Sequence, residues 1–209
     1  MIKEEIRSLV RNELQKLDKT ARWHDRFIDA SIEKTLNEMY WDVFASDPLA
    51  LQRFVKRYGY ITAILVSYEN TTGLYYSDLP APIVPFLDKS SGVRRISTPL
   101  QSGASFYPMD SREHDLIMSG SYTDTVTSKI GFSVTDRIEY FNMSASVVLS
   151  GVRMDCIVPF SAYTDEEVVL LPEIRGQGDD AFLDRVLKHL REVPPVDLND
   201  NNKDREVKE

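Results

Sequence analysis

The stretch "SKIGFSVTDRIEYFNMSASVVLSGVRMDCIVPF", residues 128–160, decides the fold class of this chain of 209 residues. Its β-branched and aromatic residues recur at short intervals without a helical period, which predicts three short strands. Turn signals separate these strands, weakly at Thr135–Asp136 and more clearly at Ser150–Gly151. Because no helical segments alternate with the strands, an antiparallel sandwich or a small barrel fits better than a parallel sheet.

A composition typical of short strands and turns extends over residues 59–176. The segment "YITAILVSYE" (60–69) predicts another strand, since it is rich in β-branched and aromatic side chains. "TTGLYYSDLPAPIVPFL" (71–87) predicts short extended pieces divided by prolines, which cannot lie in central strands. "EEVVLLP" (166–172) predicts a last short strand.

Helical patterns flank this region on both sides. Residues 1–58 carry apolar side chains at steps of three and four, interrupted near 18–20, and a third helix is expected from Pro48 to Gly59. A further helix is predicted over 177–193, where two prolines stop it, and an extended tail follows over 194–209. We therefore expect an α+β fold with N-terminal helices, a central antiparallel β sandwich or small barrel, and a C-terminal helix with an extended tail.

Composition narrows the possible functions. The chain has a net charge of −8, so a nucleic-acid-binding surface of clustered Lys and Arg is not expected. The single cysteine, Cys156, excludes an intrachain disulfide, fits a reducing compartment and is predicted to be a small core residue. No run approaches the ~20 apolar residues of a membrane span, so no membrane partner is expected.

The sequence offers little catalytic or metal-binding chemistry. His24 and His114 are each followed by an aspartate, but neighbours on a helix point about 100° apart and do not make a working pair. No serine nucleophile motif, metal-ligand spacing or phosphate-binding glycine loop is present. We expect no enzyme activity, no catalytic residues, no metal and no cofactor. A small hydrolase that uses His114 with Asp115 or Asp110 is the weaker alternative.

Two groups of side chains are candidates for contacts between subunits. Arg94 and Arg95 stand out in an acidic chain, where a pair of guanidinium groups can bind the carboxylates of a partner or phosphates. The aromatic candidates are Tyr75, Tyr76, Phe106 and Tyr107. The alternative for the arginines is pairing within the chain, and the alternative for the rings is core packing.

The tail contains a small apolar plug, "VPPVDL" (193–198), followed by eleven residues that are all polar or charged except one valine. Pro194 and Pro195 favour an extended course, so ordering the segment costs less conformational entropy. Val196 and Leu198 would then bury apolar surface in a neighbouring chain. These four residues are candidate interface residues.

Four segments together resemble the head–tail connector ring proteins of tailed bacteriophages, most closely those of the crAss-like, podovirus-like group. They are "RFIDASIEKTLNEMYWDVFASDPLALQRFVKRYGY" (26–60), "LPAPIVPFLDKSSGVRRIST" (79–98), "GVRMDCIVPF" (151–160) and "FLDRVLKHLREVPPVDLNDNN" (182–202). The likeness covers most of the chain, but it is a likeness of whole segments and contains no diagnostic short motif.

The resemblance implies a structural protein of the virion neck or tail, made in the cytoplasm of the host bacterium. Such proteins form closed rings, usually of twelve copies, and contact the portal protein and other neck or tail rings. Genomic DNA passes through without sequence-specific binding, and no cofactor takes part. A tail accessory or receptor-facing β module is the alternative for a non-enzymatic chain of this composition.

Overall fold

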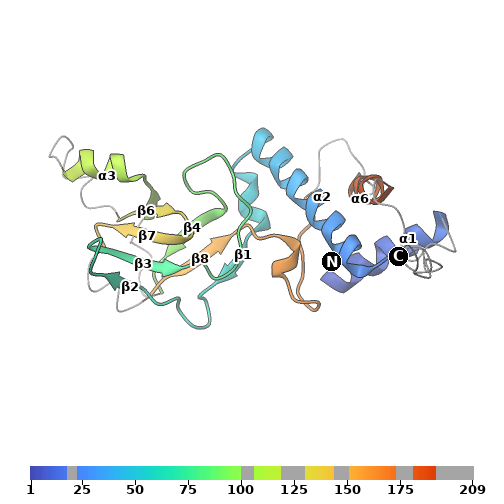
Figure 1. The fold of residues 1–209 in the computed structure, drawn as a ribbon, viewed down its shortest axis with the longest axis horizontal. Helices are drawn as coiled ribbons and strands as arrows, with labels where there is room; N and C mark the ends of the chain where they lie inside the picture. The colour runs from blue at the N-terminus through green and yellow to red at the C-terminus, as the bar shows by residue number, and fades with distance from the viewer. Residues whose placement is uncertain (18–22, 100–105, 119–129, 144–150, 173–180, 192–209) are drawn as a thin grey trace, which may run out of the picture. The chain divides into compact units, whose positions relative to one another are not determined.

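The computed structural model describes residues 1–17, 23–99, 106–118, 130–143, 151–172 and 181–191. The chain divides into two compact units, one formed by Met1–Pro48 with Pro159–Glu209 and the other by Leu49–Val158. We call them the helical unit and the β unit (Figure 1). The expected α+β class is confirmed, with helices at the N-terminal end, strands in the middle and a helix near the C-terminal end.

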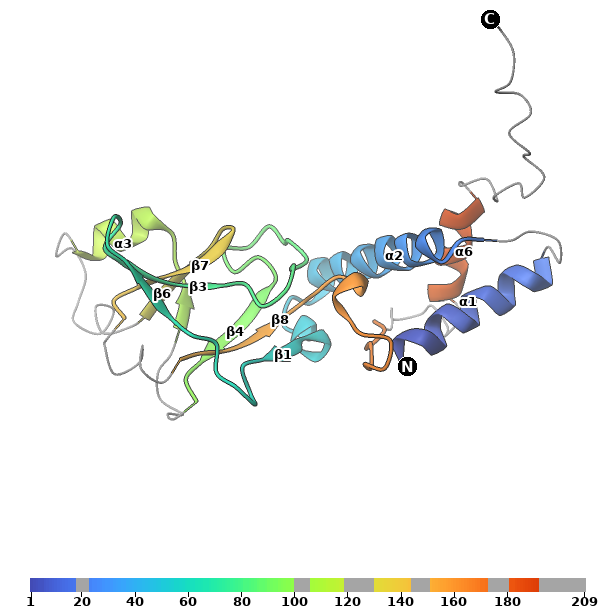
Figure 2. The same ribbon diagram turned by 60° about the horizontal axis from the view of Figure 1, so that its bottom comes forward.

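The described residues of the helical unit form three helices: α1 (Lys3–Leu17), α2 (Asp25–Ser46) and α6 (Ala181–Arg191). Each buries one stripe of side chains spaced by three and four residues, as the periodicity predicted. The buried apolar residues of the three stripes are Ile6, Val10 and Leu14; Ile28, Ile32, Leu36, Met39, Tyr40 and Val43; and Phe182, Val186 and Leu190. Figure 2 shows the three helices from a second direction.

The segment after the 3-10 turn η2 (Phe160–Ala162) wraps the start of α1. The backbone N–H of Val169 donates to the Met1 carbonyl at 2.8 Å, and the buried Lys3 Nζ donates to the Tyr163 carbonyl at 2.7 Å. The predicted last strand at 166–172 is therefore only an isolated bridge between Ile2 and Val168. Residues 159–172 pack with the helices, whereas the sequence pattern had grouped them with the strands.

In the part of the β unit that the structure describes, the strands form two sheets. Three antiparallel strands, β1 (Lys56–Tyr58), β8 (Arg153–Cys156) and β4 (Val93–Ser97), form the smaller one, with β8 in the centre. The larger sheet has the order β2-β3-β7-β6-β5, and neither sheet closes into a barrel in the described part of the chain. Its strands are β2 (Ser67–Glu69), β3 (Leu74–Asp78), β7 (Arg137–Phe141), β6 (Ile130–Val134) and β5 (Phe106–Pro108).

The three strands predicted within 128–160 are present as β6, β7 and β8. One pairing departs from the antiparallel expectation, because β5 runs parallel to β6. The predicted strand 60–69 is reduced to β2 and a bridge between Ile64 and Val152. A strand register depends on distant partners, so a local pattern finds strands better than it finds their pairing.

Two elements were assigned wrongly or missed. The helix expected between Pro48 and Gly59 is a 3-10 turn, η1 (Ala50–Phe54), followed by β1. The reason is tertiary, since Lys56, Arg57 and Tyr58 pair with β8, and strand pairing overrides a helical pattern of this length. The helix α3 (Ser111–Met118) was not predicted, although Asp110 and Glu113 have the spacing of a helix capping box.

Candidate interface surfaces

The two candidate arginines have different environments. The Arg94 side chain is only 8% exposed, and its Nη1 lies 2.6 Å from Asp88 Oδ2. Its Nη2 also donates to the Ser91 carbonyl at 3.0 Å, and its guanidinium lies 4.7 Å from the centre of the Phe86 ring. The contacts of Arg94 are therefore made within its own chain, and they stabilise the loop before β4. Arg95 is exposed and stands opposite Asp155 in the pairing of β4 with β8.

The four candidate aromatics lie on strands of the larger sheet. The Tyr75 ring contacts Tyr68 at 5.0 Å between centres, and the Arg137 guanidinium lies 4.4 Å from the Tyr76 ring. Phe106 meets the buried Tyr140 edge to face. These three side chains are half-buried within the β unit, whereas Tyr107 is 39% exposed. The tail candidates Pro194, Pro195, Val196 and Leu198 lie outside the described residues.

The histidines do not assemble into a catalytic arrangement in the described part of the chain. The His114 ring stacks on Phe141 with 4.7 Å between centres, and its Nδ1 lies 3.8 Å from Asp115 Oδ1, which is too long for a hydrogen bond. Asp110 and Glu113 cap α3 and contact Lys89 instead. His24 is exposed at the start of α2. Among the described residues no group of His, Cys, Asp and Glu is suited to hold a metal ion.

A set of exposed apolar side chains was missed by the sequence reasoning. Ile61 is fully exposed, Leu65 is 82% exposed, and Tyr68 is 52% exposed. Ile61 and Leu65 lie between β1 and β2, and Tyr68 lies in β2. We call this segment, drawn in teal in Figure 1, the apolar arm (residues 60–68). The run "YITAILVSYE" was expected to be a strand, and its preceding Gly59 was the one local turn signal beside it.

The base of the apolar arm is tightly held. Ile64 and Val152 exchange two backbone hydrogen bonds of 2.9 Å. Gly59 and Gly151 flank this bridge with φ angles of +78° and +66°, a conformation that residues with a Cβ rarely adopt. The backbone of the apolar arm is therefore held in place at Ile64, while the side chains of Ile61 and Leu65 remain exposed.

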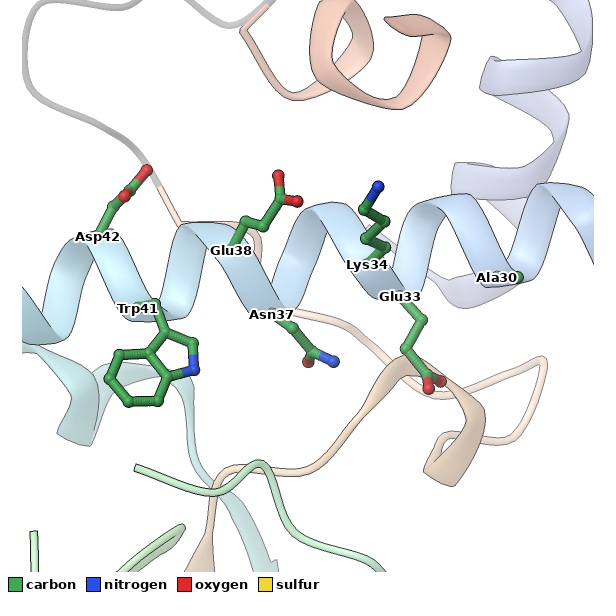
Figure 3. A pocket seen from close by; sticks show the side chains of 7 residues that line it. All are labelled: Ala30, Glu33, Lys34, Asn37, Glu38, Trp41 and Asp42. Carbon is green, nitrogen blue, oxygen red and sulfur yellow. The ribbon is translucent and has the colours of Figure 1, made fainter. Parts of the chain in front are cut away.

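The second surface is a shallow groove of about 560 Å³ on the exposed face of α2. It is lined by Ala30, Glu33, Lys34, Asn37, Glu38, Trp41 and Asp42, and we call it the α2 groove (Figure 3). Lys34, Glu38 and Asp42 project to one side of the helix, and Glu33, Asn37 and Trp41 project to the other. The groove therefore combines an aromatic ring with three carboxylates and one ammonium group.

Each carboxylate of the α2 groove uses one oxygen inside the helical unit. Asp42 Oδ2 accepts from Arg185 at 2.7 Å, and Glu38 Oε2 lies 3.0 Å from His189 Nε2. Glu33 Oε2 accepts the backbone N–H of Ser161 at 2.8 Å. No hydrogen bond or ion pair from a described residue reaches the second oxygen of any of the three, although a carboxylate has lone pairs for several donors.

No family model, curated protein or solved structure matches the chain. In the described part of the chain, no helix is both long and apolar enough to cross a membrane.

Proposed function

We propose that this chain is a structural subunit of a bacteriophage neck or tail, where copies of it form a ring between the portal and the tail and surround the DNA path. The observation that carries the proposal is the apolar arm, where Ile61 is 103% and Leu65 is 82% exposed. Large aliphatic side chains presented together on an anchored segment are typical of a surface that another protein covers.

The segment-wide resemblance to head–tail connector proteins supports the same function. The histidine geometry adds support, because neither His24 nor His114 has the partners that a hydrolase needs in the described residues. Partners of such a ring would be further copies of this chain, the portal protein and adjacent neck or tail rings.

The charge of the chain fits a channel that DNA crosses without binding. Twelve copies at −8 each carry −96 in total, so a lumen lined by this chain would repel phosphates. Such a lumen has no need of sequence-specific contacts, and the proposed role requires no cofactor.

Cryo-electron microscopy of the particles that contain the chain tests the proposal. We expect density for a closed ring around the DNA path next to the portal, with the apolar arm covered by protein. A ring-free chain at the tail tip would indicate a receptor-facing module instead. Complete absence of the chain from purified particles would overturn the proposal.

A further inference from the structure

Three arginines from three different strands meet on one face of the smaller sheet. Directly opposite residues in an antiparallel pair share a face, and both Arg57 on β1 and Arg95 on β4 stand opposite Asp155 on β8. Arg153 lies two residues before Asp155 and so projects from the same face. Met154 and Ile96, which alternate with them, are buried on the other face.

Tyr60 completes this surface. Its hydroxyl donates to Asp155 Oδ1 at 2.9 Å, while the guanidinium carbons of Arg57 and Arg153 lie 5.9 and 5.1 Å from its ring centre. Burial, followed by the hydrogen bond to the Asp155 carboxylate, raises the pKa of the Tyr60 hydroxyl. The positive charges of Arg95 and Arg57 oppose this rise. We call Arg57, Tyr60, Arg95, Arg153 and Asp155 the arginine patch.

The arginine patch carries an excess of positive charge that no ion pair with a described residue neutralises. In the described part of the chain, none of its three guanidinium groups forms an ion pair with a carboxylate. Three positive charges and one negative charge leave the patch at +2, so the rest of a chain at −8 carries −10. Arg57 and Arg95 are exposed and can reach an anionic partner.

The surroundings of the patch favour protein carboxylates over nucleic-acid phosphates as the partner. Ile61 directly follows Tyr60 and is fully exposed, and Leu65 lies four residues further along the apolar arm. Arginine, tyrosine and exposed aliphatic side chains together are typical of protein interfaces. A phosphate backbone would use the arginines but would offer nothing to Ile61.

We infer that the arginine patch docks into the α2 groove of a second copy of this chain. The α2 groove supplies the complementary chemistry: the side chains of Glu38 and Asp42 are 42% and 50% exposed, and each has an oxygen free of described partners.

The contact joins two different surfaces, so it is heterologous. A heterologous contact repeats from copy to copy and closes into a ring when the rotation allows. The inference deepens the proposed function and rests on it for ring closure, but the pairing of patch and groove is measurable on the purified chain.

Complementary variants test this contact by sedimentation velocity. Arg57→Glu with Arg95→Glu reverses the patch, and Glu38→Gln with Asp42→Asn neutralises the α2 groove while keeping its shape. We expect the unaltered chain to self-associate, and each double variant to associate at least about tenfold more weakly because a desolvated charge pair is lost. The matched control is Arg53→Glu with Arg112→Glu, two exposed arginines of the β unit outside the patch, which should associate like the unaltered chain.

Mixing the two double variants gives the sharpest result. One still has an intact groove and the other an intact patch, so an equimolar mixture should form a heterodimer that does not grow further. A mixture that stays monomeric, or an unaltered chain that is monomeric at every accessible concentration, overturns the inference.

The thermal melt of each variant shows whether it folds. If a variant does not fold, a cross-linking experiment tests the same contact. Arg57→Lys with Arg95→Lys keeps the charges and introduces amines that a carbodiimide can couple to carboxylates. Cross-links from position 57 or 95 to Glu38 or Asp42 between copies support the contact, and cross-links to other carboxylates alone contradict it. A particle ring in which the patch faces DNA or another protein would refute this contact but leave the proposed function standing.

Discussion

At the scale of single residues, Cys156 shows how burial sets reactivity. It lies on the central strand β8 with no exposed surface, as the sequence predicted for a lone cysteine in an apolar run. Burial, together with the charge of the neighbouring Asp155, raises the pKa of the Cys156 thiol from 9.0 to about 12. Since the thiolate is the reactive form, the native thiol should be nearly inert at neutral pH.

We therefore predict that iodoacetamide at pH 8 leaves Cys156 unlabelled in the native chain and labels it fully in denaturant, as read by intact mass. The denatured sample is the control for reagent activity. Rapid stoichiometric labelling of the folded protein would contradict the burial of this side chain.

The glycines at the base of the apolar arm allow a second prediction. A Cβ added at Gly59 would lie 2.6 Å from the Val152 carbonyl oxygen, and the residue has a φ of +78°. Gly73 has a similar φ of +70°, but a Cβ added there would lie 3.8 Å from its nearest neighbour, the Tyr68 hydroxyl oxygen. Gly73→Ala should cost about 1–2 kcal/mol from left-handed backbone strain alone.

Gly59→Ala should cost more than Gly73→Ala, because its methyl group also meets backbone that cannot rotate away. Urea denaturation of the two variants and the unaltered chain measures the difference. Equal losses of unfolding free energy would show that the clash at Val152 relaxes without cost.

At the scale of elements, Arg7 joins α1, α2 and the segment that follows η2. Its Nε and Nη2 bind the two oxygens of Asp29 at 2.6 Å each, and its Nη1 binds Asp165 at 2.6 Å. The hydrogen bonds to Asp29, followed by those to Glu4 and Asp165, raise the pKa of Arg7 well above its ordinary value. The Arg7 side chain is 15% exposed, so solvent screens these contacts only partly.

We predict that Arg7→Ala lowers the unfolding free energy by about 1.5–3 kcal/mol, because charge-assisted hydrogen bonds are the stronger kind. Arg11→Ala is the matched control one helical turn away. The Arg11 side chain is 34% exposed and its partner Asp25 is 65% exposed, so its loss should cost less than about 1 kcal/mol. Similar losses in chemical denaturation would contradict a special role for Arg7.

The short helix α3 depends on a capping box that is sensitive to acid. Asp110 Oδ1 accepts the Glu113 N–H at 2.9 Å, and Glu113 Oε2 accepts the Asp110 N–H at 3.1 Å. The hydrogen bond from Lys89, followed by that from the Asp110 N–H, lowers the pKa of Glu113 below its ordinary 4.5. The Glu113 N–H, followed by the charge of Lys89, lowers the pKa of Asp110 below 3.8.

A carboxylate whose pKa is lower in the folded state stabilises that state above its unfolded pKa and stops doing so as the pH falls through the folded value. We predict that the Asp110 amide, which donates to Glu113 Oε2, loses its protection from exchange, measured by NMR, as the pH falls through the lowered pKa of Glu113. Glu113→Gln keeps the capping hydrogen bond without a titrating group. The variant should therefore lose most of this pH dependence, and an unchanged profile would assign the effect to other groups.

At the scale of the whole molecule, the tail remains a prediction, because residues 192–209 lie outside the described part of the chain. If Val196 and Leu198 bury in a neighbour, each contributes about 1.5–3 kcal/mol to assembly. Replacing both by Asp should prevent incorporation into particles, measured by immunoblot, without changing the melting temperature of the isolated chain. Deleting the polar residues 203–209 is the control and should leave incorporation intact.

Much of the secondary structure follows from local sequence. The spacing of Ile6, Val10 and Leu14 predicts α1, and the texture of 128–160 predicts β6, β7 and β8, because both signals come from residues close in the chain. The burial of Cys156 follows in the same way. The local signal fails where pairing between distant strands determines the secondary structure. Lys56–Tyr58 pairs with β8 as a strand despite its helical pattern.

The candidate surfaces are formed by residues that lie far apart in the chain. Arg95 was singled out from sequence, but its neighbour Arg94 turned out to pair within its own loop. The partners that complete the arginine patch are Arg57 and Arg153, and only the strand register brings these three residues to one face. The sequence by itself determined α1, α2 and α6, the main strands and the buried thiol, since propensity and periodicity are local. Tertiary structure alone decided which charges meet and which apolar side chains stay exposed, because these properties depend on pairing between segments far apart in the chain.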